Sequence, residues 1–352
     1  MTRLFEAKPY IVAEVGSNWA SREDAVASIG AAKAAGADCV KFQAFDWESL
    51  YGPNEEKRRL EEIADLPGCP TRPLRLPLAW LPALKEKAHA CGIDFACTAF
   101  SPELVAAVDP FVPWHKVASS DATWPQLLEA VAATGKPIVL SVGAKSRGDI
   151  AATLQTLGGP AKARTVLMYC VSAYPARTID LRVMAELNVY GLRVGFSDHS
   201  TDIVGHPVAA ARQGAVVIEK HFTAFPELDT PDRPHSLTAD EFQTMVENIR
   251  GTRRHAIGPT PEERDMLLKY NRRLLATRDI AAGDVFTYGH NFGAYRSLVE
   301  DTRGFSPFMW RHVEGGIALA PIERGEAIGP GDFSQGNACG KTPRHLWPEE
   351  YR

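Results

Sequence analysis

The chain contains few cysteines and has no excess of positive charge. Its 352 residues include six cysteines, and no two of them stand at the spacing of a metal-ligand pair. A disulfide framework is unusual in a chain of this size, so we expect free thiols in a reducing cytoplasm. The formal net charge of -4 gives no electrostatic support for a nucleic-acid partner. Small-molecule chemistry is therefore the expectation.

Targeting signals and long apolar stretches are also missing. The N-terminal segment MTRLFEAKPYIVAEVG has neither the basic patch nor the apolar stretch of a signal peptide. No apolar run approaches the roughly 20 residues that span a bilayer. We therefore expect a soluble, cytoplasmic protein with no membrane partner.

Short apolar runs alternate with longer amphipathic stretches between residues 10 and 256. Eight such runs can be counted: YIVAEV, CVKFQ, IDFACT, HKVAS, PIVLSV, TVLMYC, LRVGFS and VVIEK. Continuous apolar strands that alternate with helices favour parallel pairing and an α/β fold. Eight units predict a (β/α)₈ barrel, and an open doubly wound sheet is the alternative.

Polar residues follow the predicted strands, at the edge where a barrel places its active site. They are Glu14, Asn18, Lys41, Gln43, Thr98, Lys116, Ser119, Asp121, Ser141, Ser172, Tyr174, Ser197, Asp198, His199, Glu219, Lys220 and His221. A barrel with a purely structural role has no need of such a ring.

Two histidines in this ring suggest a metal. His199 and His221 follow the seventh and eighth predicted strands, so their imidazoles would be neighbours. Imidazole binds divalent transition metals, and two protein nitrogens leave positions open for substrate. An isolated histidine is more often structural, but two at adjacent strand ends favour a metal site.

Two lysines in the ring suggest an anion. Burying an ammonium group is costly unless an anion meets it, and Lys41 and Lys116 would converge at the barrel mouth. Each nearby hydroxyl, taken alone, could equally be a helix cap. Together with the lysines, four hydroxyls form a set suited to phosphate and carboxylate oxygens: Thr98, Ser119, Ser141 and Ser197.

Three carboxylates near the predicted mouth leave two interpretations open. Glu14, Asp121 and Asp232 could hold sugar hydroxyls or act as a general acid or base. A salt bridge to a neighbouring basic residue is the equally plausible structural interpretation.

A second domain is predicted after the barrel. We place the barrel at residues 1–257, a linker at 258–272 and a small β-rich domain at 273–352. Within the last part, RDIAAGDVF and APIERGEAI share the pattern Ile, two residues, Gly, an acidic residue, one residue, then an apolar residue. This pattern predicts two similar β-turn units.

The motifs resemble those of a known family. AEVGSNW, GADCVKFQ, FACTAFSPEL, KVASSD, GLRVGFSDHS and GAVVIEKHFT occur in this order, as they do in sialic acid synthases. That family includes the N-acetylneuraminate, legionaminate and pseudaminate synthases and the spore-coat polysaccharide proteins. The segment RRLLATRDIAAGDVFTYGHNF resembles their C-terminal antifreeze-like (SAF, β-clip) domain. The resemblance covers nearly the whole chain.

The resemblance implies a reaction and its components. It implies condensation of phosphoenolpyruvate with the aldehyde of an N-acylated amino sugar, giving a nonulosonic acid and phosphate. Mn²⁺ is the metal that it implies, with Mg²⁺ or Co²⁺ as alternatives. It also implies a domain-swapped homodimer, in which the small domain of one subunit supplies an arginine to the sugar site of the other.

The resemblance also implies a role for each matching residue. His199 and His221 would hold the metal, and Glu14, Asp121 and His221 would be catalytic. Phosphoenolpyruvate would contact Lys41, Thr98, Lys116, Ser119, Ser141, Ser172 and Ser197. The sugar would contact Gln43, Tyr174, Asp232 and, from the partner subunit, Arg296, for which Arg303 is the alternative.

Several residues depart from the family pattern on the expected sugar side. Trp19 stands where a histidine is usual, and Asp121 replaces a glutamate. The usual Gly, Pro, Asp, His run reads Thr230, Pro231, Asp232, Arg233. Phosphoenolpyruvate use is therefore a firmer expectation than any named sugar. Two alternatives remain: another phosphoenolpyruvate-dependent aldol synthase or lyase, or a non-catalytic sugar-binding homologue.

Overall fold

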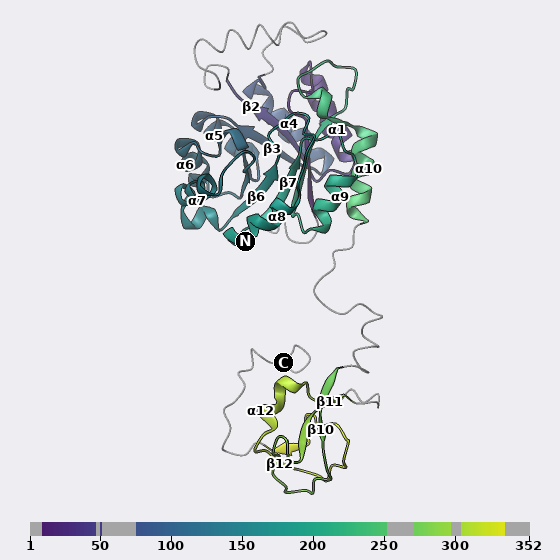
Figure 1. Ribbon diagram of the computed structural model, residues 1–352. Coiled ribbons are helices and arrows are strands. Elements are labelled where there is room, and N and C mark those ends of the chain that lie inside the picture. Colours follow the sequence, from purple (N-terminus) through teal and green to yellow (C-terminus); the bar gives the residue numbers. More distant parts are fainter. Residues whose placement is uncertain (1–8, 47–49, 51–74, 252–270, 297–303, 335–352) are drawn as a thin grey trace. The chain divides into compact units, whose positions relative to one another are not determined.

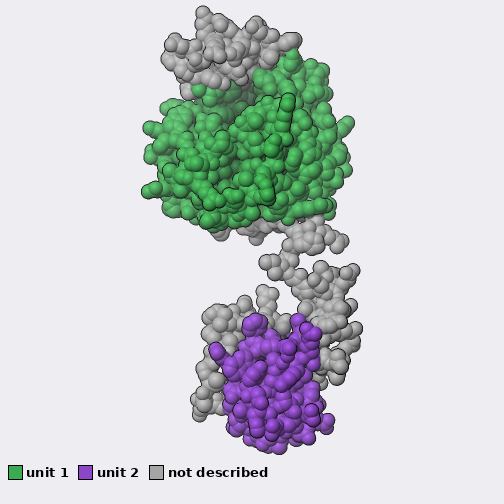
Figure 2. All heavy atoms as spheres, in the orientation of Figure 1, with its two compact units in different colours: residues 1–255 green, residues 256–352 purple. Residues whose placement is uncertain are grey.

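The chain forms two units, residues 1–255 and 256–352 (Figure 2). The computed structural model describes residues 9–46, 50, 75–251, 271–296 and 304–334. The predicted linker, 258–272, lies almost entirely outside these residues. The domain boundaries drawn from the sequence therefore stay a prediction.

Eight parallel strands build the first unit (Figure 1). They are β1 (Tyr10–Glu14), β2 (Cys39–Ala44), β3 (Asp94–Ala99), β4 (His115–Val117), β5 (Ile138–Ser141), β6 (Thr165–Cys170), β7 (Arg193–Asp198) and β8 (Val217–Thr223). Their hydrogen-bonded order is β3-β2-β1-β8-β7-β6-β5-β4, with a short β9 (Leu237–Thr238) on the end of β8. The end strands β3 and β4 contact each other, so the sheet is nearly closed. This confirms the (β/α)₈ barrel.

Helices surround the barrel (Figure 1). They are α1 (Arg22–Ala34), α4 (Leu81–Cys91), α5 (Pro102–Val108), α6 (Pro125–Ala133), α7 (Arg147–Lys162), α8 (Arg182–Leu187), α9 (Gly205–Arg212) and α10 (Ala239–Arg250). Short 3₁₀ helices stand between them: η2 (Leu78–Trp80), η3 (Asp109–Phe111), η4 (Ser119–Asp121), η5 (Asn188–Tyr190) and η6 (Arg233–His235). Within the described ranges, no helix has the length and apolar character needed to cross a bilayer.

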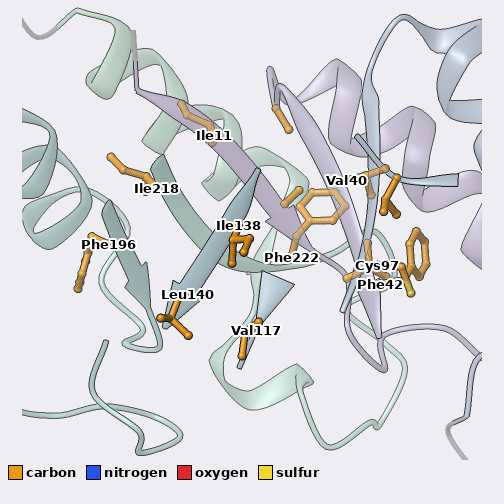
Figure 3. Close-up of a cluster of buried hydrophobic side chains, with 14 of the residues drawn as sticks. Ile11, Val40, Phe42, Cys97, Val117, Ile138, Leu140, Phe196, Ile218 and Phe222 are labelled. Atoms are coloured by element: carbon orange, nitrogen blue, oxygen red, sulfur yellow. The ribbon is translucent and has the colours of Figure 1, made fainter. Parts of the chain in front are cut away.

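Side chains alternate between the two faces of each strand, and both faces are buried. Outward-facing residues pack against the helices, and Figure 3 shows part of this cluster, including Ile11, Val40, Phe42, Ile138, Leu140, Phe196, Ile218 and Phe222. Burying one such side chain contributes about 1.5–3 kcal/mol. A second cluster fills the barrel, with Val12, Cys39, Ala96, Trp114, Val139, Val166, Met168 and Val217. Gly195 gives it room, because a Cβ there would lie 2.3 Å from Met168 Sδ.

The same alternation places polar side chains at the barrel mouth. Residues two positions apart on a strand face the same side, so the position after each interior apolar residue also faces inward. Glu14 follows Val12 in this way, and Lys41 follows Cys39. At the ends of the other strands the inward positions include Thr98, Lys116, Ser141, Ser197, Glu219 and His221. The barrel interior is therefore apolar below and polar at its carboxyl end.

The second unit is small and rich in β-structure. It contains β10 (Arg272–Ala276), which pairs antiparallel with β11 (Phe292–Arg296), and β12 (Ile317–Ala318), which pairs antiparallel with β13 (Phe333–Ser334). A 3₁₀ turn, η7 (Pro307–Met309), leads into α12 (Trp310–Val313). Its own core includes Leu274, Ile280, Phe286, Phe292, Met309, Val313, Ile322 and Ile328.

Two turns of this unit have matching hydrogen bonds. Ala281 donates its backbone N–H to the Asp284 carboxylate, and Glu323 donates its backbone N–H to the Glu326 carboxylate, each at 2.8 Å. The isoleucine just before each turn pairs with the other, since Ile280 and Ile322 exchange two backbone hydrogen bonds of 2.9 Å. The two predicted β-turn units are thus confirmed. The antifreeze-like assignment stays a prediction.

Candidate active site at the barrel mouth

A cavity of about 470 Å³ opens at the carboxyl ends of the strands. Most of the residues singled out from the sequence line it: Glu14, Lys41, Gln43, Thr98, Lys116, Ser119, Ser141, Ser172, Tyr174, His199, His221 and Asp232. The other lining residues, which had been given no role, include Glu219 and His235.

Four predicted site residues are not in the lining. Ser197 is buried, and its hydroxyl donates to Glu219 Oε1 at 3.1 Å. The carboxylate of Asp121 accepts a hydrogen bond of 3.1 Å from Ser120, and burial raises its pKa. Arg296 ends β11 in the second unit, and Arg303 lies outside the described residues.

Glu219 connects the two cavity lysines. Its Oε1 lies 3.3 Å from Lys116 Nζ, and its Oε2 lies 3.7 Å from Lys41 Nζ. Burial by itself would raise the pKa of Glu219, but the ammonium groups of Lys116 and Lys41 outweigh burial and hold it at about 2. The buried positive charges are therefore partly neutralised before any anion enters.

Glu14 makes a second ion pair on the same floor. It pairs with Lys41 and accepts a hydrogen bond of 2.7 Å from the Gln43 amide. Burial raises the pKa of Glu14, although the charge of Lys41 opposes the rise. A buried carboxyl with a raised pKa can hold and release a proton nearer neutral pH than an exposed one can.

Hydroxyl groups border the lysines. Thr98 accepts a hydrogen bond of 3.0 Å from Lys41, and the hydroxyls of Ser119 and Ser172 lie 2.9 Å apart. Ser141 Oγ is buried and has no hydrogen-bond partner among the described residues. Hydroxyl and ammonium donors that converge in this way suit the oxygens of a phosphate or carboxylate.

His199 follows β7 with a fixed orientation. Its Nδ1–H donates to the Val171 carbonyl at 2.8 Å, and its Nε2 lies 3.3 Å from Ser197 Oγ. Burial lowers the pKa of His199 to about 4, so the imidazole is neutral near pH 7. The ring of Tyr174 stacks on it, with centroids 4.3 Å apart.

His221, near the end of β8, stands between two other histidines. Its ring centroid lies 5.8 Å from that of His199 and 4.5 Å from that of His235. Its Nδ1 is buried and has no hydrogen-bond partner in the described part of the chain. Burial holds the pKa of His221 well below its usual range, so this imidazole is also neutral.

The loop after β1 holds Asp232 in place. Ser17 donates both its backbone N–H and its hydroxyl to Asp232 Oδ2, each at 2.8 Å. The approach is close because Gly16 has no side chain, and a Cβ there would lie 2.2 Å from that oxygen. Gly16 also has φ +55, which favours glycine. Two elements more than 200 residues apart are thereby joined at the cavity.

The next residues of the same loop are structural. Asn18 donates to the Phe222 carbonyl and to Ser236 Oγ, at 3.0 and 2.8 Å. Trp19 donates from its indole N–H to the Gly16 carbonyl and packs edge-on against Trp80. The tryptophan that departs from the family pattern is thus buried beside the loop, and it does not line the cavity.

Comparison with known proteins identifies the family to which this barrel belongs. Residues 28–259, more than half of the chain, match the NeuB family. The chain belongs to the NeuB family. An uncharacterized protein of Methanocaldococcus jannaschii is 33% identical over 78% of this chain and 81% of its own length. The N,N'-diacetyllegionaminic acid synthase of Campylobacter jejuni is 31% identical over 91% of this chain and 99% of its own.

A solved structure agrees with this membership of the NeuB family. The N-acetylneuraminic acid (sialic acid) synthetase of Leptospira borgpetersenii superposes with a TM-score of 0.66 at 28% identity. The superposition covers 74% of this chain and 90% of the other. The resemblance drawn from the sequence motifs is therefore confirmed.

The cavity of this NeuB-family chain offers donors that fit a divalent metal. His221, Asp232 and His235 each offer one ligand atom, and these three atoms lie within 4.8 Å of one another. The buried His221 Nδ1 and His235 Nε2 both lack a hydrogen-bond partner among the described residues. Imidazole with carboxylate is a donor set for Mn²⁺, Fe²⁺, Co²⁺ or Zn²⁺.

Two cavity residues were missed by the sequence interpretation. Glu219 was counted among the strand-end residues, but it stands in the run VVIEK beside His221 and received no role. His235 follows Arg233 by two positions. The departure at Arg233, where the family pattern has a histidine, is a local hint at His235, but it does not place that side chain in the cavity.

Proposed function

We propose that this chain is a nonulosonic acid synthase, which condenses phosphoenolpyruvate with the open-chain aldehyde of an N-acylated amino sugar. One observation carries the proposal: a single cavity joins two buried lysines, Lys41 and Lys116, to two neutral histidines, His199 and His221. The lysines suit an anionic substrate, and the histidines suit a divalent metal. Membership of the NeuB family supports the same reaction.

Phosphoenolpyruvate would occupy the lysine side of the cavity. Lys41 and Lys116 would bind its carboxylate and phosphate, with Thr98, Ser119, Ser141 and Ser172 as hydroxyl donors. Ser197 would contribute indirectly, because its hydrogen bond orients Glu219, which contacts both lysines. Because Glu219 already lies between the lysines, it keeps them in position when the cavity holds no anion.

The reaction forms one new carbon–carbon bond and requires the transfer of a proton to the aldehyde oxygen. Carbon 3 of phosphoenolpyruvate attacks the aldehyde carbon, and the aldehyde oxygen takes a proton to become a hydroxyl. Water then adds at carbon 2, the bond from carbon 2 to the phosphate oxygen breaks, and phosphate leaves. Glu14 is our candidate to deliver and recover the proton, because it lies in the cavity with a raised pKa. Asp121 lies outside the lining.

A divalent metal would be held by His199 and His221, with Mn²⁺ preferred and Mg²⁺ or Co²⁺ as alternatives. When bound, it supplies Lewis-acid polarisation of the aldehyde. The neutral state of both imidazoles favours binding, because a metal ligand must be deprotonated.

The sugar would occupy the opposite side of the cavity, against Gln43, Tyr174 and Asp232. In a domain-swapped homodimer, Arg296 of the partner subunit would complete this side, with Arg303 as the alternative. The sequence departs from the family pattern in this region. We therefore propose the class of sugar, an N-acylated hexosamine, and no single compound.

Phosphate release tests the proposal. Purified protein with Mn²⁺ and phosphoenolpyruvate is assayed across a panel of N-acylated hexosamines and of sugars without an N-acyl group, with and without chelator. We expect release with one sugar, lost in chelator and in His221→Ala, while His206→Ala retains it because His206 lies outside the lining. Release only with sugars that lack an N-acyl group indicates another aldol synthase. Binding of phosphoenolpyruvate with no release for any sugar indicates a binding protein.

A further inference from the structure

His235 is a buried imidazole whose outer nitrogen makes no hydrogen bond within the described part of the chain. Only 4% of the residue is exposed, and its Nε2 has no hydrogen-bond partner in the described part of the chain. The nearest carboxylate oxygen, Asp232 Oδ1, lies 3.6 Å away, which is beyond hydrogen-bond distance. A buried polar atom without a hydrogen bond lowers the stability of the fold. A bound ligand at His235 Nε2 would remove this cost.

The carboxylate of Asp232, which faces His235, is held in a fixed orientation. Its Oδ2 accepts both hydrogen bonds from Ser17, which fixes the carboxylate and leaves Oδ1 directed at His235. Carboxylates that bind metals are commonly held by such secondary hydrogen bonds. His221 completes the group from β8, and its buried Nδ1 also lacks a partner.

We propose that His235 is a further protein ligand of the divalent cation, which it holds together with Asp232 and with His221, the histidine already assigned to the metal in the proposed function. Bonds of about 2.1 Å place two ligand atoms at most about 4.2 Å apart. The ligand atoms of the three residues lie within 4.8 Å of one another, so a small rotation of the side chains is enough to bring them to this spacing. The inference deepens the proposed function at the same cavity, but cation binding without substrate tests it whether or not the synthase reaction occurs.

The donor set also sets a preference among metals. Two imidazoles with one carboxylate favour Mn²⁺, Co²⁺ or Zn²⁺ over Mg²⁺, which prefers oxygen ligands and keeps its water. Without His235, the cation keeps fewer nitrogen ligands, so this preference weakens. His235 is therefore expected to raise both affinity and selectivity.

The experiment measures Mn²⁺ binding to the full chain in the absence of substrate. Free Mn²⁺ is followed by its EPR signal during titration, and pulsed EPR reports the nitrogen atoms bound to the ion. The variants are His235→Ala, His235→Gln and His221→Ala. His206→Ala is the matched control, because His206 also faces a carboxylate, with Nδ1 3.0 Å from Asp202, but lies outside the cavity lining.

The expected result is weaker binding by about tenfold or more in both His235 variants, with the coupling of one bound nitrogen lost. His206→Ala should bind as the wild type does. If His235→Ala fails to fold, as judged by circular dichroism, His235→Gln decides the outcome. Affinity within about twofold of wild type, with unchanged nitrogen couplings, overturns the inference. In that case, loss of binding in His221→Ala leaves the synthase proposal standing.

Discussion

The carboxylate of Asp198 lies 2.8 Å from the ammonium of Lys220, and both side chains are completely buried. Lys220 also donates to the backbone carbonyls of Ser200 and Asp202, at 2.5 and 3.0 Å. Both residues belong to the strand-end ring predicted from the sequence, yet neither lines the cavity. Their ion pair connects β8 to the end of β7, and the two backbone hydrogen bonds of Lys220 connect β8 to the loop after His199.

Replacing Lys220 by Ala should destabilise the barrel strongly. The change leaves Asp198 buried without its partner, and breaking a buried pair in this way costs about 3–5 kcal/mol. Urea unfolding followed by circular dichroism measures the loss. Arg147→Ala is the control, because the Arg147–Glu186 pair is exposed and solvent screening makes its contribution much smaller. Equal losses in the two variants would contradict the role of the buried pair.

Lys116 should dominate phosphoenolpyruvate binding over its neighbour Lys145. Both lysines line the cavity, but Lys116 is buried and Lys145 is partly exposed. Lys116→Met is expected to raise KM for phosphoenolpyruvate by about tenfold or more, because contacts with a desolvated charge are the strong ones. Lys145→Met should change KM much less. Steady-state kinetics with varied phosphoenolpyruvate compares them, and the reverse order would reject the placement of the anion.

Asp202 should stabilise the start of α9 in a pH-dependent way. Its carboxylate accepts backbone hydrogen bonds from Val204, Gly205 and His206 at 3.1, 2.9 and 2.7 Å. Burial by itself would raise the pKa of Asp202, but these amides outweigh burial and lower it. Asp202→Ala should therefore cost about 0.5–2 kcal/mol at pH 7.

The sign of this pH dependence follows from the direction of the shift. A carboxyl with a lowered pKa in the folded state contributes stability above its unfolded pKa of about 3.9, and loses it as pH falls through the folded value. The difference between wild type and Asp202→Ala in urea unfolding should shrink from pH 7 to about pH 3. A constant difference over this range would show that ionisation of Asp202 contributes nothing.

Mixed subunits test the domain-swapped homodimer. His221→Ala and Arg296→Ala should each be inactive alone, because each lacks one part of every site. Co-expressed, they form mixed dimers in which one site has an intact barrel and an intact arginine. Random pairing predicts about a quarter of wild-type activity. Activity no higher than in either variant alone excludes sharing through Arg296, and the same mixture with Arg303→Ala tests the alternative residue.

Barrel strands were predictable because both of their faces are buried. The run TVLMYC corresponds to β6, Thr165–Cys170, and every residue of it is buried. Such runs stand out because the helices and the barrel interior both demand apolar side chains. The strand ends were predictable for the same reason, because the sequence changes from apolar to polar residues where the buried part of each strand ends.

The direction of each side chain at the mouth was harder to predict. Ser197 faces the barrel interior but lies beneath Glu219, and Asp121 belongs to η4, beyond the end of β4. The position of Asp232 depends on Ser17, which stands 215 residues earlier in the chain. A contact of that kind has no local signature, so the sequence alone could not bring His235 into the cavity.

The pairing of Ile280 with Ile322 has a consequence for the order of folding. Ile280 cannot complete its backbone hydrogen bonds until Ile322 has been synthesised. The barrel can close once β8, which pairs with β1, has left the ribosome. Because contacts between distant residues form slowly and N-terminal domains fold first during synthesis, the second unit should acquire its structure last. A nascent chain that stalls before residue 322 would therefore carry a finished barrel and an incompletely paired, protease-sensitive second unit.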